Sequence, residues 1–414
     1  MDEKVVVGID VGTTKVCTLV AQEGSSGGLH ILGSGVEASQ GLRKGVVVDL
    51  DASTKAISRS VDKAERQSGL EISSALVSLA GSHVSSVNNR GTVGVAGRTV
   101  DNEDVMRAVD SARAVPISHN QEVVHVIQRG FNLDGQDGIR TPVGMHAYRL
   151  EVETHIITAS AASVENLRQS VQNMGVEISQ FVLNPLAAAE EALTETERLM
   201  GAVICDIGGG TTDIGVYVNG DVWHTAVLAL GGNHITSDIA QGLRLPMSQA
   251  EEIKLKHGRA LVNDIDPNQY FHVRTIGEQE PIQVNQRDLI HIITARVEEI
   301  FSMVKQEIRR SGYEGLFPAG MVLTGGSSML PGIREVASSV MGLPVRIATP
   351  DNLSGNSDNL VTPAFTTSVG LLRWAYLMSE VASQKRNGRQ KMSPIGNFSL
   401  DWATVQTFLK RLLP

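Results

Sequence analysis

Apolar residues follow two different periods along this chain, and segments of the two kinds alternate. Short runs rich in β-branched residues, such as the valines at 5–7, are typical of buried strands. Between them lie stretches in which apolar residues recur every three or four positions, as Ile57, Val61 and Ala64 do, and this spacing predicts amphipathic helices. Such helices are expected at residues 51–68, 102–114, 164–174, 288–310 and 366–378. Strands that alternate with helices predict an α/β fold.

One predicted strand ends in a carboxylate followed by glycines. Residues 202–205 are apolar, Asp206 ends the run, and a glycine-rich loop follows. Glycines let the backbone approach a ligand closely and turn its amide hydrogens toward it, and threonine hydroxyls can bind the same oxygens. A carboxylate cannot bind phosphate directly, but it can hold a hydrated Mg²⁺ that does. The loop comprises Gly208, Gly209, Gly210, Thr211, Thr212 and Asp213, and the alternative is a glycine-rich hairpin with an acidic tip.

The same pattern occurs near the start of the chain. An apolar strand ends at Asp10, and Gly12, Thr13 and Thr14 follow before a strand-like run returns. Two such loops far apart in one chain predict a duplicated unit. We therefore expect two loops that close on one phosphate chain from opposite sides.

A third glycine loop follows the predicted strand at 321–324. It contains Gly325, Gly326 and Ser327, and a junction of strand, glycine and helix lets a flat ligand or a phosphate lie against the backbone. Before it, Gly231-Gly232 opens a helix, and residues 248–251 fit a capping box for the next one. Glu251 and Lys254 lie three residues apart on one face of that helix. They are either part of a ligand site or a cap beside a solvated lysine.

Composition limits the function. The chain has 414 residues, enough for two to four domains, and its 42% hydrophobic and 20% charged content are ordinary for a globular protein. The net charge of −9 argues against general nucleic-acid binding. Cys17 and Cys205 both fall in predicted buried strands and are expected to be free thiols in a reducing compartment. We expect no signal peptide at the N-terminus and no run long enough to span a membrane.

The end of the chain differs from the rest. Residues 379–414 contain six basic and two acidic residues, a net charge of +4. Because the whole chain has a net charge of −9, residues 1–378 carry −9 − 4 = −13. Residues 379–398 are predicted to be a flexible linker, and 399–414 a short amphipathic helix. Its apolar and basic residues, Trp402, Val405, Phe408, Leu409, Lys410, Arg411, Leu412 and Leu413, are typical of a helix lying in an anionic membrane interface. The alternative is a helix that docks on the protein's own core.

The three glycine loops, in this order, resemble the phosphate-1, phosphate-2 and adenosine motifs of the actin, Hsp70 and sugar-kinase superfamily. The resemblance implies an actin-like duplicated nucleotide-binding core with ATP and Mg²⁺ as ligands. Asp10 and Asp206 would hold the Mg²⁺ through water. The remaining nucleotide-binding residues would be Gly12, Thr13, Thr14, Lys15, Gly208, Gly209, Gly210, Thr211, Thr212, Asp213, Gly232, Glu251, Lys254, Gly325, Gly326 and Ser327.

Together with an inserted α+β subdomain at 83–161 and the terminal amphipathic helix, these motifs resemble the FtsA family of bacterial cell-division proteins. The resemblance implies subdomain 1A from residues 1–82, 162–195 and 351–378, insert 1C, subdomain 2A from 196–230 and 307–350, and subdomain 2B from 231–306. It also implies self-assembly into actin-like filaments and a peripheral position on the cytoplasmic face of the membrane at midcell. The expected partners are the FtsZ C-terminal tail at 2B, later division proteins at 1C and anionic lipid.

One position departs from the superfamily pattern. Hsp70 and MreB relatives carry a glutamate, assigned to orienting the attacking water, where this chain has Asn184 before Pro185. An amide can hydrogen-bond water but cannot take its proton, so at most slow ATP hydrolysis is expected. Two alternatives share the core: a PilM-like pilus-assembly protein, which would lack the membrane tail, and a true kinase or Hsp70-type ATPase.

Overall fold

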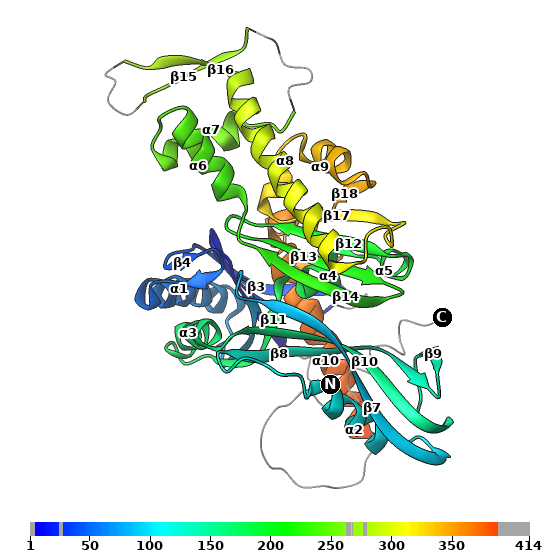
Figure 1. Ribbon diagram of the computed structural model, residues 1–414. Helices are drawn as coiled ribbons and strands as arrows, with labels where there is room; N and C mark the ends of the chain where they lie inside the picture. Colours follow the sequence, from blue (N-terminus) through cyan, green and yellow to red (C-terminus); the bar gives the residue numbers. More distant parts are fainter. Residues whose placement is uncertain (1–4, 25–27, 262–265, 267, 276–279, 388–414) are drawn as a thin grey trace.

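The computed structural model describes residues 5–24, 28–261, 266, 268–275 and 280–387, with 379–387 as backbone. The predicted membrane helix at 399–414 therefore lies outside the described residues. The chain forms two domains stacked along one long axis, with a third sheet projecting beside the first domain (Figure 1). Among the described residues, no helix is long and apolar enough to cross a membrane.

The first domain is built on a six-stranded sheet in the order β11-β6-β1-β2-β3-β19. Side chains alternate along β2: Val16 and Val20 pack toward α1, whereas Cys17 and Leu19 pack toward α10. The elements are β1 (Val5–Val11), β2 (Lys15–Glu23), β3 (Leu29–Ala38), β6 (Ser74–Leu79), β11 (Glu177–Leu183) and β19 (Leu353–Gly355), with α1 (Leu50–Ser68), α3 (Ala161–Gln172), α4 (Asn184–Ala192), α10 (Thr366–Asn387) and the hairpin β4 (Leu42–Arg43) and β5 (Val46–Val47).

Capping residues in the sequence fix both ends of helix α1. The Asp49 side chain accepts a hydrogen bond from the Ala52 amide at the start, and Gly69 ends the helix in the left-handed conformation with φ of 72°. Ile57 and Val61 lie on its buried face, as predicted.

An inserted α+β subdomain, as predicted, follows β6. Its four strands pair in the order β7-β10-β8-β9, and α2 covers one face. A separate apolar core, with Val105, Phe131 and Leu150 among its members, fills the space between them. The elements are β7 (Ser85–Thr99), α2 (Asn102–Arg113), β8 (Gln121–Leu133), β9 (Gln136–Ile139) and β10 (His146–Ser160).

The second domain repeats the plan of the first. Its sheet has the order β14-β13-β12-β17-β18, in which β12 pairs antiparallel with β13 and parallel with β17, just as β1 pairs with β2 and β6. The elements are α5 (Glu195–Met200), β12 (Ala202–Ile207), β13 (Thr212–Val218), β14 (Asp221–Leu228), α6 (Gly232–Gly242), α7 (Met247–His257), β15 (Tyr270–Val273), β16 (Ile282–Asn285), α8 (Gln286–Ser311), β17 (Gly320–Thr324), α9 (Ile333–Met341) and β18 (Val345–Ile347).

Two predicted local details are wrong. Helix α7 begins at Met247 after Pro246, with no side-chain cap, so Ser248 lies inside the helix rather than at its N-cap. The Pro246 carbonyl accepts the first hydrogen bond of the helix, from the Ala250 amide at 2.9 Å, so the helix has already begun before Ser248. Helix α10 continues to Asn387 rather than ending at residue 378. Residues 379–387 contain no glycine or proline, and the first glycine is Gly388, so the sequence offers no earlier stop signal.

Candidate nucleotide site

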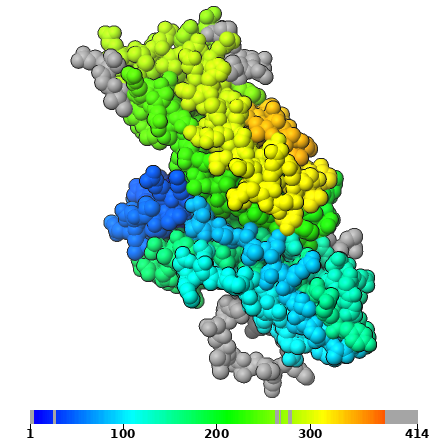
Figure 2. Space-filling view, in the orientation of Figure 1, coloured from blue at the N-terminus to red at the C-terminus, as the bar shows by residue number. Residues whose placement is uncertain are grey.

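A cleft of about 490 Å³ lies between the two domains. This volume falls in the usual range for small-molecule sites. The surface is indented where the blue first domain meets the green α6 region (Figure 2). The predicted residues that line the cleft are Asp10, Gly12, Thr13, Thr14, Lys15, Asp206, Gly208, Gly209, Gly210, Thr211, Asp213, Gly232, Glu251, Lys254, Gly325, Gly326 and Ser327.

Thr212 is the one predicted nucleotide residue that does not line the cleft. Its hydroxyl donates to the Leu230 carbonyl at 2.9 Å, and the side chain is fully buried. Thr212 is the first residue of β13, and side chains alternate across a strand, so Asp213 faces the cleft and Thr212 faces the other way. Its role is therefore structural.

The first loop joins β1 to β2 and places Asp10 at the floor of the cleft. Both oxygens of this carboxylate accept hydroxyl hydrogen bonds, Oδ1 from Ser78 at 3.0 Å and Oδ2 from Ser368 at 2.6 Å. Lys15 Nζ lies 4.0 Å from Asp10 and donates to the Ala364 carbonyl at 2.6 Å. The lysine thus spans from the first loop to the segment that precedes α10.

The second loop is fixed by its neighbours on both sides. The Gly208 amide donates to the Thr211 carbonyl at 2.9 Å and closes the turn. The Gly208 carbonyl accepts from the Gly232 amide at 2.9 Å and from Ser327 Oγ at 3.0 Å. The start of α6 and the third glycine loop therefore hold this turn in place.

The tips of the two loops touch. A Cβ added at Gly209 would lie 1.9 Å from Thr14 Oγ1, and one added at Gly210 would lie 2.6 Å from Thr13 Oγ1. Only glycine fits at either position. A ligand bound between the loops would contact both domains at once.

Three carboxylates gather where the loops meet. Burial, helped by the charge of Asp10, raises the pKa of Asp206 to about 6. Burial also raises the pKa of Asp213 well above its usual value. Clustered buried carboxylates of this kind are stabilised by a cation.

Two buried oxygen atoms in this region have no hydrogen-bond partner: Oδ1 of Asp213, one of the three carboxylates, and Oδ1 of the nearby Asn184. Both residues line the cleft. Buried polar atoms are normally paired, so these point to a polar ligand, and oxygen donors of this type suit hydrated Mg²⁺. Among the described residues, no cluster of three or more His, Cys, Asp or Glu side chains is arranged to hold a metal directly.

The opposite end of the cleft is less charged. Thr236 connects Glu251 and Lys254: its hydroxyl bonds to the Glu251 carboxylate, and Lys254 Nζ donates to it at 2.9 Å. Lys254 also pairs with Glu251 at 2.7 Å. The apolar side chains here are Ile235, Leu255, Met329, Leu330 and Pro331. An apolar end beside a polar, glycine-lined end matches a nucleotide's base and its phosphates.

Sequence reasoning missed several residues of the site. Thr367 and Ala364 line the cleft from the segment around the start of α10, and Asn233 lines it from α6. None of them belongs to a glycine motif. The run of three hydroxyl residues from Thr366 to Ser368, just after Pro363, was the available signal at a helix start.

The chain is similar in sequence to proteins of one known family. The sequence profile described as "Cell division protein FtsA" matches residues 203–370, and the profile "SHS2 domain inserted in FTSA" matches residues 81–158. The chain is 38% identical to cell division protein FtsA of Pseudomonas aeruginosa, over 95% of this chain and 93% of that protein. It is 36% identical to the Escherichia coli protein of that name, over 93% and 94% of the two chains.

Solved structures agree on the fold. The chain resembles the PilM–PilN type IV pilus biogenesis complex with a TM-score of 0.65 and 16% identity, over 88% of this chain and 97% of that one. It resembles MreB5 of Spiroplasma citri bound to AMPPNP with a TM-score of 0.56 and 14% identity, over 94% and 100%. At these identities the resemblance shows an actin-like fold, as predicted, and nothing finer.

Proposed function

The chain belongs to the FtsA family of cell division proteins, and we propose that it binds Mg²⁺ and ATP between its two domains and tethers the division ring to the membrane. The observation that carries this proposal is the interdomain cleft, which gathers two glycine loops from different domains around buried carboxylates. In this role the nucleotide acts as a structural ligand that holds the two domains together.

Different residues of the cleft would bind the phosphates, the Mg²⁺ ion and the sugar of the nucleotide. The glycine loops present backbone amides and threonine hydroxyls to the phosphates, and Lys15 adds a positive charge at the first loop. Asp10 and Asp206 would hold Mg²⁺ through water, and the bound ion would neutralise phosphate charge. Glu251 and Lys254, which the buried Thr236 hydroxyl connects, would bind the sugar side.

Hydrolysis is expected to be slow. Asn184 stands at the start of α4, beside Asp213, where an attacking water would have to be activated. Its amide can orient water but cannot accept the proton. The protein would then switch between assembled and free states on a slow nucleotide cycle.

Membrane attachment and assembly complete the proposed function. The apolar and basic tail at 399–414 would lie in the inner face of the membrane, and filaments would gain strength from many tails at once. The FtsZ C-terminal tail would bind subdomain 2B within 231–306, and later division proteins would bind the insert at 83–161.

Two measurements test the proposal. Titration with a fluorescent ATP analogue should show saturable binding that depends on Mg²⁺. Co-sedimentation with anionic vesicles should be lost when residues 399–414 are deleted, while ATP binding is unchanged. Absence of nucleotide binding would remove the first half of the proposal, and vesicle binding without the tail would remove the second.

A further inference from the structure

We infer that Thr367 and Ser368, neighbours in the first turn of α10, position the two cleft carboxylates for a shared cation. The inference rests on the proposed binding of Mg²⁺ and ATP. It assigns a role to two residues that belong to no glycine motif and that only the fold brings beside the cleft carboxylates.

The two hydroxyls reach opposite domains. Ser368 Oγ donates to Asp10 Oδ2 at 2.6 Å, and Asp10 belongs to β1 of the first domain. Thr367 Oγ1 donates to Asp206 Oδ2 at 2.5 Å, and Asp206 belongs to β12 of the second domain. One helical turn therefore holds one carboxylate from each half of the molecule.

The first turn of α10 is also bound to the second domain through other atoms. Thr324 Oγ1, at the end of β17, lies 2.6 Å from Thr366 Oγ1. The Gly325 amide donates to the Pro363 carbonyl at 3.0 Å. Thr366, Thr367 and Ser368 are all buried, so these hydrogen bonds do not compete with bulk water.

The next turn of α10 is fixed in the first domain. Gly370 passes so close to α4 that an added Cβ would lie 1.9 Å from the Ala187 carbonyl oxygen. Val369 and Leu372 are buried against the first sheet. This close crossing sets the rotation of α10 about its axis, and that rotation aims the Thr367 and Ser368 hydroxyls at the two carboxylates.

The arrangement has a direct consequence for cation binding. Asp10 and Asp206 carry like charges, and their repulsion opposes holding both carboxylates beside one cation. A hydroxyl bound to each carboxylate fixes its rotation and holds the pair in place before the cation arrives. Groups that orient metal-binding carboxylates in this way typically contribute about 10- to 100-fold to metal affinity.

The test is Thr367→Val, which keeps the shape of the side chain and removes the hydroxyl. The Mg²⁺ concentration that half-saturates binding of a fluorescent ATP analogue should rise about 10- to 100-fold. Binding of the same analogue in EDTA should change less than twofold, because the glycine loops are intact. Thr367→Ser should restore the wild-type Mg²⁺ requirement, and Thr92→Val, on an exposed position of β7, serves as the matched control.

Three results would contradict the inference or the proposed function. The positioning role would be overturned if Thr367→Val raised the half-saturating Mg²⁺ concentration less than threefold. It would also be overturned if the variant lost ATP-analogue binding equally in Mg²⁺ and in EDTA, because a structural defect of the cleft produces that result. Ser368→Ala, which acts on Asp10, provides a second variant if Thr367→Val fails to fold. Wild-type protein that binds no ATP analogue under either condition would instead overturn the proposed function and the inference with it.

Discussion

Arg140 of the inserted subdomain donates from Nη1 to both carboxylate oxygens of Asp221 in the second domain, at 2.7 and 2.6 Å. The same guanidinium also bonds to the Asn219 carbonyl. By chain order the insert belongs to the first domain. This ion pair therefore connects it to the domain on the other side of the nucleotide cleft.

The ion pair is part of a wider contact between two edge strands. Ser86 Oγ donates to the Thr225 carbonyl at 2.8 Å, and Asn88 Nδ2 donates to the Trp223 carbonyl at 3.0 Å. Because β7 and β14 are each the outer strand of a sheet, these side chains satisfy backbone groups that an exposed edge would leave open. Among described residues, the insert thus connects both domains.

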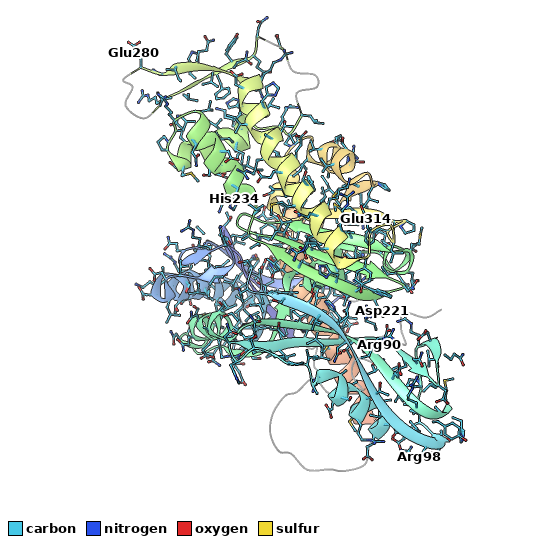
Figure 3. The ribbon with its side chains drawn as sticks, viewed as in Figure 1. Arg90, Arg98, Asp221, His234, Glu280 and Glu314 are labelled. Atoms are coloured by element: carbon cyan, nitrogen blue, oxygen red, sulfur yellow. The ribbon has the colours of Figure 1, made fainter. Side chains whose placement is uncertain are left out.

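Arg140→Ala should weaken this connection. The change leaves the buried Asp221 carboxylate without its partner, and we expect a loss of about 1.5–3 kcal/mol in the free energy of unfolding. Urea denaturation followed by fluorescence measures it. Arg90→Ala is the control, because Arg90 is 63% exposed and its pair with Glu153 should contribute less than about 1 kcal/mol. Figure 3 labels Arg90 and Asp221. Equal effects of the two variants would contradict the prediction.

Gly209→Asp should abolish ATP binding. The new side chain would meet Thr14 at the contact between the loops and would bring a negative charge to the phosphate position. Calorimetric titration with Mg²⁺ and ATP measures it. Gly94→Asp, in open space on the insert, should bind like wild type. Retained affinity in Gly209→Asp would mean that the phosphates lie elsewhere.

ATP turnover should be far below about 10 per second, the median for enzymes. The reason is the amide of Asn184 in place of a proton acceptor. Phosphate release from purified protein measures the rate, and Gly209→Asp shows the background from contaminants. A rate near the enzyme median would show that another residue of the cleft activates water.

Trp402→Glu should release the protein from anionic vesicles. A charge at this position opposes insertion of the apolar face, while each basic residue near the surface contributes about 1 kcal/mol that salt weakens. Vesicle co-sedimentation measures binding, and Trp402→Phe should retain it. If Trp402→Glu sediments as well as wild type, the tail is not the anchor.

Acid should destabilise the protein below pH 6.5. His155 of the insert is buried where the insert contacts Thr225 of the second domain, and burial lowers its pKa to about 3. An unfolded histidine has a pKa of about 6.5, so below that pH the unfolded chain takes up a proton that the native protein excludes. The contribution of His155 to stability is therefore fully present above about pH 6.5 and falls by roughly 1.4 kcal/mol per pH unit between there and about pH 3.

The variant His155→Gln isolates this effect. Its loss of unfolding free energy between pH 7 and pH 5 should be smaller than that of wild type by about 2 kcal/mol. His146→Gln, on an exposed position, should leave the wild-type slope unchanged. Identical slopes for His155→Gln and wild type would show that His155 does not control acid sensitivity.

The sequence predicted the glycine loops because their chemistry is local. A strand that ends in Asp10 or Asp206 and continues into glycine can be recognised without knowing the fold. The Asn219-Gly220 turn between β13 and β14 is also predictable from neighbouring residues, because an Asn-Gly pair favours the positive φ that both residues adopt, 53° and 84°. Local patterns of this kind need only neighbouring residues.

Contacts between distant segments were not predictable in this way. Thr367 meets Asp206 only because α10 crosses α4 at Gly370. Nothing near Thr367 in the sequence indicates a carboxylate partner. The misplaced cap at Ser248 has a different cause, since two local signals competed there and the proline prevailed.

The pairing of β19 with β3 affects how the protein is made. Leu353 lies opposite Leu29, so the outer edge of the first sheet is covered by the strand of that sheet that is synthesised last. At about 5–20 residues per second, about 16–65 s separate the synthesis of the two strands. The second domain is contiguous and can fold during this interval, whereas the first domain waits with an open strand edge. Chaperones that cover such an edge during translation would therefore raise the yield of native protein.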